Sequence, residues 1–475
     1  MFKKTVLTKK KFMKLFPVLL FFFLSLGAVY SQSTFIVVDT ISIVGNNTTK
    51  SYIIINQLDI KRGDTIYFNN LAIKFKDNRN RILDTGLFVE AILNLKDLNT
   101  KTGHCSLEIT VKESLFIIPK LIFDLTDRNF NEWYYEHDAD LSRINYGIEL
   151  EHKNITGNKD ALQFKWQRGI THKYEMRYIR PFLKKDNRLG LIFNILYKYS
   201  KEIAYATLNN KLVFLKNKNY NLLKQFRVSL GLTYRTNIYD THSFTFYYFD
   251  SNVHPDVLKK NADYFAKTQS QKNISLVYSF TKDKRKYKMY PNGGYLLGGQ
   301  ITKRGIGIFD DINQVDITIN AEKYFYINKT YISAYIFKGK FRALGDDLPY
   351  FNNKAIGYED DLINGYDLNV VDGKHFMYLK TSQRFKIFSG VMDLDRRIFI
   401  NQFKYIPYEF YLSINFDVAY VNNNVNFVNN RFENRILHGH GVGIDMLIYN
   451  SLFQINYSIN HIGEDGVFFY YKASF

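Results

Sequence analysis

The last residues of this chain constrain its fold more than any other stretch. From Val467 to Phe475 the side chains alternate: one face is apolar or aromatic throughout, whereas the other turns polar at Lys472 and Ser474. Alternation of this kind that ends on an aromatic residue is typical of bacterial outer-membrane β-barrels, whose strands show one face to lipid and the other to the lumen. We interpret Phe475 as a C-terminal barrel signal.

The N-terminus has the pattern of a secretory signal peptide. Six lysines precede a short apolar core at 15–26, and we expect cleavage after Ser31. An uncleaved anchor is the alternative, but this apolar run is shorter than the roughly 18 residues that a membrane helix needs. No later stretch reaches that length. We therefore predict a signal peptide at 1–31 and a mature chain that can cross a membrane only as strands.

The charge of the chain also bears on its partners. The formal net charge is +19, and removal of the six lysines of the signal segment leaves +13. Nucleic acid is one partner that basic charge permits, but here the charge is scattered and the chain is expected to be exported. Basic loops and a basic lumen, close to anionic lipid headgroups, explain it better. We expect no nucleic-acid partner. The single cysteine, Cys105, excludes an intramolecular disulfide, and we expect it to be a buried small hydrophobe.

Residues 34–113 predict a small α+β domain. The expected order is strand, helix, helix, strand, strand, with Thr48 or Thr49 capping the first helix. We expect the strands at 41–46, 87–95 and 106–111. The first helix should end near residue 56, and the second should span 69–83.

Residues 115–475 change to alternating strands, seen best at 315–322, 412–418 and 453–460. A soluble sandwich would show the same alternation, but the signal peptide and the 37 Tyr and 41 Phe favour a transmembrane barrel. We predict about sixteen antiparallel strands and long loops at 235–271, 342–372 and 386–409. The expected strand starts are near 115, 144, 159, 172, 189, 202, 222, 272, 293, 312, 329, 373, 410, 438, 452 and 466.

Several stretches resemble one known superfamily. Residues 34–113 resemble a POTRA domain, and residues 115–475 are similar to the barrel of BamA/TamA-type outer-membrane insertases, so a single POTRA-like domain would precede the barrel. The POTRA resemblance rests on 43–49, 60–64, 81–88 and 107–113, and the barrel resemblance on 283–294, 357–373, 416–417 and 439–475.

The resemblance implies that residues 357–373 form a loop that folds into the barrel. The family carries an Arg-Gly-Phe/Tyr core there, whereas this chain has Asn364, Gly365 and Tyr366. The family's Arg reaches acidic groups on the inner wall; one of these corresponds to Ser382 here and the other to Asp417. Joint loss of the Arg and one acid would replace a buried ionic contact with neutral hydrogen bonds.

The candidate site residues also have plainer interpretations. Gly365 and Tyr366 could form an ordinary turn with a packed aromatic side chain. We favour the other interpretation, in which they form the tip of a loop that braces the lumen. Asp417 is either a lumen partner of the loop or a solvated carboxylate, and both stay open.

We expect no catalytic, cofactor or metal site. The chain lacks a Gly-x-Ser-x-Gly elbow, a His-Glu-x-x-His motif and a phosphate-binding glycine loop. His438 and His440 lie on one strand face, with no further ligand close in sequence.

By resemblance, we expect a factor that assembles or translocates polypeptides at the outer membrane, with its N-terminal domain in the periplasm. Its partners would be outer-membrane lipid and client polypeptides or periplasmic proteins. A secretion pore for a polypeptide or solute is the alternative, and a non-catalytic surface antigen is the third. In the leading hypothesis, the first and last strands part to offer an edge to the client.

Overall fold

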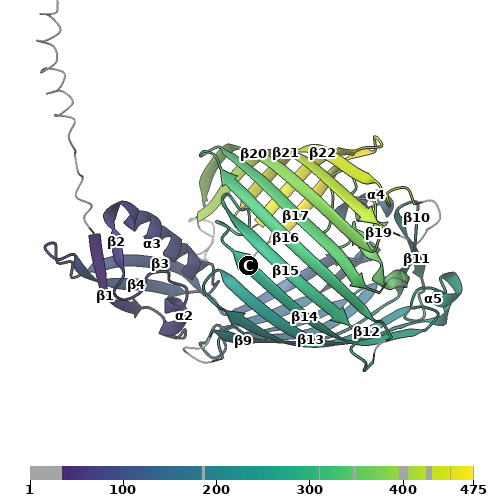
Figure 1. The fold of residues 1–475 in the computed structure, drawn as a ribbon, viewed down its shortest axis with the longest axis horizontal. Coiled ribbons are helices and arrows are strands. Elements are labelled where there is room, and N and C mark those ends of the chain that lie inside the picture. The colour runs from purple at the N-terminus through teal and green to yellow at the C-terminus, as the bar shows by residue number, and fades with distance from the viewer. Residues whose placement is uncertain are drawn as a thin grey trace, which may run out of the picture.

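The structure is a computed structural model that describes residues 35–183, 188–309, 311–345, 349–394, 405–423, 430–449 and 451–473. The predicted signal peptide at 1–31 and the C-terminal Phe475 lie outside the described residues. A small N-terminal domain lies beside one end of a barrel of tilted strands (Figure 1). We call this the near end of the barrel and the opposite one the far end.

The N-terminal domain is a four-stranded sheet of order β2-β1-β4-β3 with helices packed on it. Its elements are β1 (Phe35–Val44), α2 (Ser51–Ile55), β2 (Thr65–Tyr67), α3 (Phe68–Leu83), β3 (Phe88–Lys96) and β4 (His104–Glu113). Alternate β-branched and aliphatic residues of β1 and β4 point to one face and form the core with the helices, and Cys105 is buried among them, as predicted. The sequence did not predict the short strand β2.

The predicted threonine cap of the first helix is wrong. The N-cap of α2 is Lys50, whose side chain makes no capping hydrogen bond. Instead, the backbone N–H groups of Thr48 and Thr49 donate to the Glu113 carboxylate, at 3.1 and 2.6 Å from Oε1. The carboxylate thus holds the turn that leads into the helix, and at the helix start Ile53 N donates to Lys50 O at 2.9 Å.

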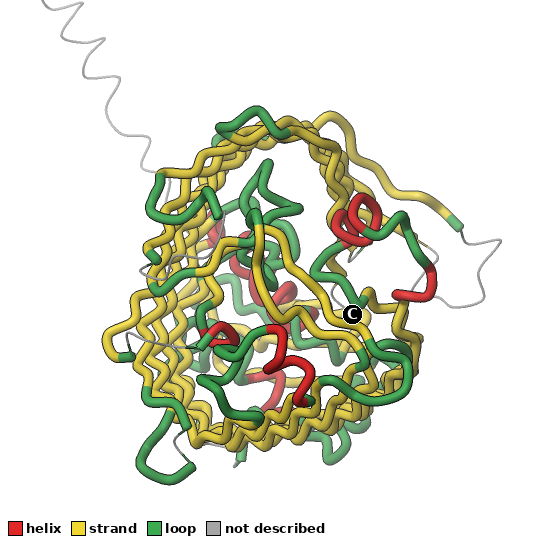
Figure 2. The backbone as a smooth tube through the Cα atoms, turned by 90° about the vertical axis from the view of Figure 1, so that its right-hand side faces the viewer, coloured by secondary structure: helices red, strands yellow, loops and turns green. Residues whose placement is uncertain are grey.

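The barrel is one antiparallel sheet of sixteen strands, which confirms the predicted fold class. Viewed from its far end, the sheet curves into a ring, and loops and short helices project within its outline (Figure 2). The strands are β5 (Ile117–Leu125), β6 (Ile144–Lys153), β7 (Ala161–Arg168), β8 (Thr171–Arg180), β9 (Leu189–Ser200), β12 (Leu223–Arg235), β13 (Asp240–Val253), β14 (Ser270–Asp283), β15 (Gly294–Arg304), β16 (Gln314–Tyr326), β17 (Tyr331–Leu344), β20 (His375–Asp393), β21 (Tyr405–Asn422), β22 (Ile436–Ile448), β23 (Ser451–Asn460) and β24 (Asp465–Ala473).

Alternation decides which side chains face out. In β21, Leu412, Ile414 and Phe416 are exposed, whereas Ser413 and Asp417 are buried on the lumen side. The other barrel strands add Leu, Ile, Phe and Tyr side chains to the outside of the ring. A barrel with an apolar exterior and a polar interior is suited to lipid. None of the described helices is long and apolar enough to cross a membrane.

One predicted strand and two predicted loops differ from the structure, although the number of barrel strands agrees. The predicted loop 386–409 overlaps the end of β20 and the start of β21. The strand predicted near 202 is β10 (Glu202–Leu208), which pairs only with β11 (Lys211–Lys216) in a hairpin outside the barrel sheet. The predicted loop 235–271 contains the barrel strand β13. Consecutive Phe246, Tyr247, Tyr248 and Phe249 hide the alternation of β13, because aromatic side chains stand on both of its faces.

Loops close together at the far end. The hairpin β10–β11 packs with α5 (Pro255–Lys260) and the 3₁₀ turn η2 (Tyr350–Asn352) around a small apolar core. At the hairpin tip, the buried Asn210 accepts a backbone hydrogen bond from Val370 N at 2.7 Å, and its amide Nδ2 donates to Val370 O at 3.2 Å. The hairpin is therefore tied to the loop that precedes β20. The loop that precedes β20 also contains a two-stranded pair, formed by β18 (Lys354–Ile356) and β19 (Val371–Asp372).

The N-terminal domain docks on turns at the near end. Phe182, from the turn after β8, is buried in the core of that domain and packs edge-on against Tyr52 at 6.4 Å. The Tyr52 hydroxyl donates to Asn158 Oδ1 at 2.5 Å, and Arg81 Nη2 donates to the Tyr239 hydroxyl at 2.7 Å. Three turns between β6 and β13 thus hold the domain.

Candidate functional site at the barrel seam

The sheet of the barrel begins at β5 and ends at β24. Within the described residues, β5 pairs only with β6 and β24 only with β23, so no backbone ladder joins the two end strands. We call the region between them the seam. A cavity of about 930 Å³ lies there, lined by residues of β5, β20, β21, β23 and β24 and of the loop 357–373. On β5, the Phe123 side chain is 75% exposed.

A short helix, α4 (Phe130–Glu136), lies against the seam edge of β24. Asn129 caps it by accepting from Glu132 N at 2.8 Å, and Arg128 N donates back to Glu132 Oε2 at 2.8 Å. The Asn131 amide then faces Phe469: its Oδ1 accepts from Phe469 N at 2.8 Å and its Nδ2 approaches Phe469 O at 3.4 Å. The Asn131 side chain thus takes the place that a neighbouring strand would have.

The second edge contact of α4 comes from Tyr135, whose hydroxyl donates to Val467 O at 3.0 Å. Phe130 packs edge-on against Phe469 at 5.2 Å between ring centroids. Because Phe469 and Val467 are two residues apart, both show their free backbone groups to the same edge of β24.

Residues 357–373, the inward loop, lie inside the barrel next to this edge. Gly365 has a φ of +78°, and a Cβ there would lie 2.6 Å from the carbonyl carbon of Ile459 in β23. Gly439 in β22 likewise leaves room for the carbonyl oxygen of Asn364. Gly365 N donates to Ser458 Oγ at 3.0 Å. Two glycines on opposite partners therefore let the loop touch the wall backbone directly.

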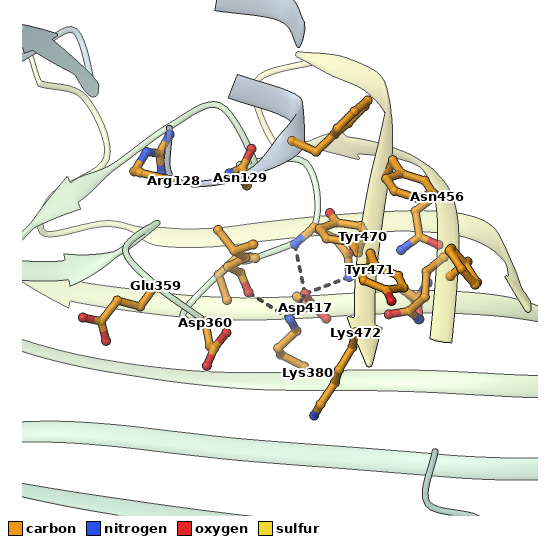
Figure 3. A pocket seen from close by; sticks show the side chains of 18 of the residues that line it. Arg128, Asn129, Glu359, Asp360, Lys380, Asp417, Asn456, Tyr470, Tyr471 and Lys472 are labelled. Carbon is orange, nitrogen blue, oxygen red and sulfur yellow. Dashed lines mark hydrogen bonds and ion pairs between the residues drawn. The ribbon is translucent and has the colours of Figure 1, made fainter. Parts of the chain in front are cut away.

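Asn364 and Asp417 are brought together by the fold. The backbone N–H and the side-chain amide of Asn364 both donate to Asp417 Oδ2, at 3.0 and 2.8 Å. Asp417 is 1% exposed. Lys380, its cross-strand neighbour on β20, places Nζ 3.9 Å from the same oxygen and donates to Leu362 O at 2.9 Å (Figure 3). The cation at this site therefore comes from the wall and not from the loop.

Tyr366 is buried at the turn of the inward loop. Its hydroxyl donates to His438 O at 3.2 Å and also contacts the His461 ring. Phe432 packs edge-on against it, with ring centroids 5.3 Å apart. These contacts lie on β22 and on the turn after β23, so Tyr366 fixes the loop to β22 and to the turn of the last hairpin. Ser382, which the sequence resemblance matches to an acidic residue of the family, lines the seam cavity.

The inward loop also holds α4 and β24. Arg128 Nη1 donates to the carbonyl oxygen of Gly357 and, at 3.3 Å, to that of Asn369. Asn129 Nδ2 donates to Asp367 O at 3.1 Å, and the Asp367 carboxylate accepts from the Tyr470 hydroxyl. The inward loop thus contacts the barrel wall, α4 and the last strand at the same time.

Sequence reasoning missed α4 and Lys380. Asn129 and Glu132 have the spacing of a capping box, which is a usable signal for a helix start. No comparable signal marks Lys380, because its role depends on the register that places it opposite Asp417.

The comparisons with known proteins concern the fold of the chain. No family model matches the chain, and no curated protein matches its sequence. The structure of BamA from Haemophilus ducreyi lacking POTRA domains 1-3 matches 92% of this chain and 84% of its own, at 13% identity and a TM-score of 0.52. This chain has the BamA fold. Since the barrel makes up about three quarters of the residues, the match extends into the N-terminal domain.

Two other solved structures are similar to the chain. CdiB from Acinetobacter baumannii matches 92% of this chain and 73% of its own, at 13% identity and a TM-score of 0.47. CdiB from Escherichia coli matches 94% and 91%, at 9% identity and a TM-score of 0.49.

Proposed function

We propose that this protein is a BamA/TamA-type factor that assembles or translocates other polypeptides at the bacterial outer membrane. The seam between β5 and β24 is the observation that carries this proposal. A backbone N–H or C=O without a partner costs several kcal/mol in hydrocarbon. An incoming strand that pairs with a seam edge satisfies these groups before it meets lipid, so the barrel can act as a template.

The rest of the chain supports this role. The apolar exterior of the barrel would lie in the outer membrane. The N-terminal domain, as a POTRA-like domain in the periplasm, would receive client polypeptides or periplasmic partners by strand addition at its exposed edges. Templating requires no chemical step, so we propose that the protein is not an enzyme and uses no cofactor.

A secretion pore is the second candidate, and the polar lumen supports it. A cavity of about 950 Å³ lies inside the barrel, with Asp316, Lys340 and Asp361 among its polar lining. Against a free axial path, the Asn210 contacts tie the β10–β11 hairpin to the inward loop across the far end. We therefore favour lateral delivery through the seam. A surface antigen that works through far-end loops would need no seam.

The proposal is tested in phospholipid vesicles with the full mature chain. One cysteine replaces Phe123 on β5 and another replaces Tyr471 on β24, and bifunctional thiol reagents of graded length join them. Both sites line the seam cavity, and the native Cys105 is buried. We expect the unlocked protein to speed the folding of a small client barrel and the locked protein to lose this effect, as judged against each single-cysteine variant.

The same vesicles separate the alternatives. Undiminished client folding with a locked seam would exclude the lateral route. Ion conductance that persists in the locked protein, without any acceleration of folding, would favour the pore. Absence of both activities would leave the surface antigen.

A further inference from the structure

The seam edge of β24 is only partly covered. β5 starts at the near end, next to the N-terminal domain, and the sixteen strands alternate in direction, so β24 runs back to the near end. α4 follows β5 and therefore covers the far half of the edge, at Val467 and Phe469. By alternation, Tyr471 shows its N–H and C=O to the same edge. Among the described residues these two groups have no hydrogen-bond partner on the seam side.

The contacts of α4 imitate those of a strand but are fewer. Asn131 offers one acceptor and one donor to Phe469, as a residue in a paired strand does, and Tyr135 offers one donor to Val467. Each contact comes from a side chain, so it holds only while the helix stays in one orientation. A real strand would continue the ladder past Tyr471 to the near end.

We propose that α4 is a built-in competitor for the β24 edge: its Asn131 and Tyr135 hold the place of an added strand, and an extended polypeptide displaces the helix. This inference rests on the proposed function and specifies how the acceptor edge is regulated. The incoming strand would pair first at the uncovered near-end groups of Tyr471 and would then replace the α4 contacts in turn.

The surroundings of α4 fit a helix that leaves its place. Phe130, Tyr134 and Tyr135 are between 39 and 53% exposed, and aromatic side chains of this kind favour the membrane–water interface. Displacement would also break the Arg128 and Asn129 contacts with the inward loop. Whether α4 covers the β24 edge is thereby coupled to the inward loop, which contacts β22 and β23.

The first test measures how firmly α4 covers the β24 edge when no client polypeptide is present. The Phe469 amide is held by Asn131 Oδ1, so its hydrogen exchange in lipid nanodiscs reports departure of α4. We expect Asn131→Ala to raise the exchange rate about fivefold, the effect of losing one hydrogen bond. Tyr135→Phe should raise it less. Tyr134→Phe is the matched control, because it removes a hydroxyl of the same helix with no hydrogen bond among the described residues, and it should leave the rate unchanged.

The second test measures competition directly. A fluorescent peptide with the sequence of residues 465–475 serves as the extended strand. Cysteines at Phe130 and Phe469, whose rings are 5.2 Å apart, are joined by a short reagent that a reductant cleaves. We expect the lock to weaken peptide binding about tenfold or more, reduction to restore it, and Asn131→Ala to strengthen it about fivefold. Each single-cysteine variant loses the packing of Phe130 on Phe469, so it should bind the peptide at least as tightly as the parent and should not respond to the reagent.

The outcomes are separable. Equal peptide binding with and without the lock, binding by no variant, or unchanged Phe469 exchange in Asn131→Ala would each overturn the competitor role. If the competition holds but the protein does not speed client folding in vesicles, the proposed assembly function fails and the competitor role stands.

Discussion

The two sides of the barrel wall are held together by different means. From β6 to β13 the ladder is continuous; β12 and β13, for example, pair from Leu223↔Val253 to Arg235↔Thr241. The N-terminal domain adds a buried contact at Phe182 under this side. At the seam, β24 lacks a strand partner on its seam side among the described residues, and side chains of α4 and of the inward loop contact it there instead.

This difference separates a rigid support from a movable edge. A backbone ladder opens only when many hydrogen bonds break together, whereas side-chain contacts can exchange one at a time. The side that carries the N-terminal domain therefore suits a fixed platform. The seam suits reversible pairing, and the following substitutions test this contrast.

The largest effect is expected on the docked side. Phe182→Ala should lower the free energy of unfolding of the N-terminal domain by about 3–5 kcal/mol, because it empties a buried aromatic site. Limited proteolysis at residues 114–116 measures the loosened junction. Phe325→Ala, at an exposed site on β16, is the control and should change little. Equal protease resistance of the two variants would contradict a rigid platform.

The next effect concerns the seam side. Gly365→Ala should destabilise the barrel by about 3 kcal/mol, because the new methyl group meets the β23 backbone and the residue has a positive φ. Gly463→Ala isolates the φ contribution, since its φ is +85° and no atom lies within 4 Å of the place that a Cβ would take. It should cost about 1 kcal/mol. Thermal unfolding followed by heat-dependent gel mobility measures both, and similar losses would argue against tight loop docking.

A smaller loss of stability is expected when the Asp417 carboxylate beneath the inward loop is removed. Asp417→Asn should cost about 2 kcal/mol, because Lys380 loses its anionic neighbour and Asn364 loses a charged acceptor. Asp360→Asn makes the same change at an exposed position of the inward loop and should be near neutral. The difference between the two unfolding free energies measures the loop anchor. If the variants match, Asp417 is not an anchor.

The smallest effect is a pH dependence in the N-terminal domain. Burial raises the pKa of Glu113, but hydrogen bonds from Thr49 and Thr48 outweigh it and hold the pKa below its ordinary value of 4.5. The carboxylate therefore stabilises the fold fully above pH 4.5, and the contribution is lost as the pH falls through the lowered pKa. Glu113→Gln should cost about 1 kcal/mol at pH 7 and nothing in strong acid. Glu90→Gln, at an exposed site on β3, should show no such dependence in urea titrations.

Sequence reasoning succeeded where one physical signal dominates. At 412–418 in β21 and at 453–460 in β23, apolar and polar residues alternate without interruption, so strand and face both follow from the pattern. It failed at β10, because strand-like alternation does not show whether a hairpin joins the barrel sheet. It also failed at β13, where aromatic residues on both faces conceal the alternation. The site was predicted in part: Asn364, Gly365, Tyr366 and Asp417 were singled out by resemblance, whereas α4 and Lys380 were not.

The amino-acid sequence is sufficient to predict the alternation of the strands, their approximate number and the change of pattern between the two domains. These depend on local periodicity, which is set by neighbours along the chain. The three-dimensional fold is needed to show that β24 keeps an edge, that Asn131 occupies it and that Lys380 lies opposite Asp417. Such contacts join residues up to 338 positions apart, and their partners depend on register and closure, which no local pattern encodes.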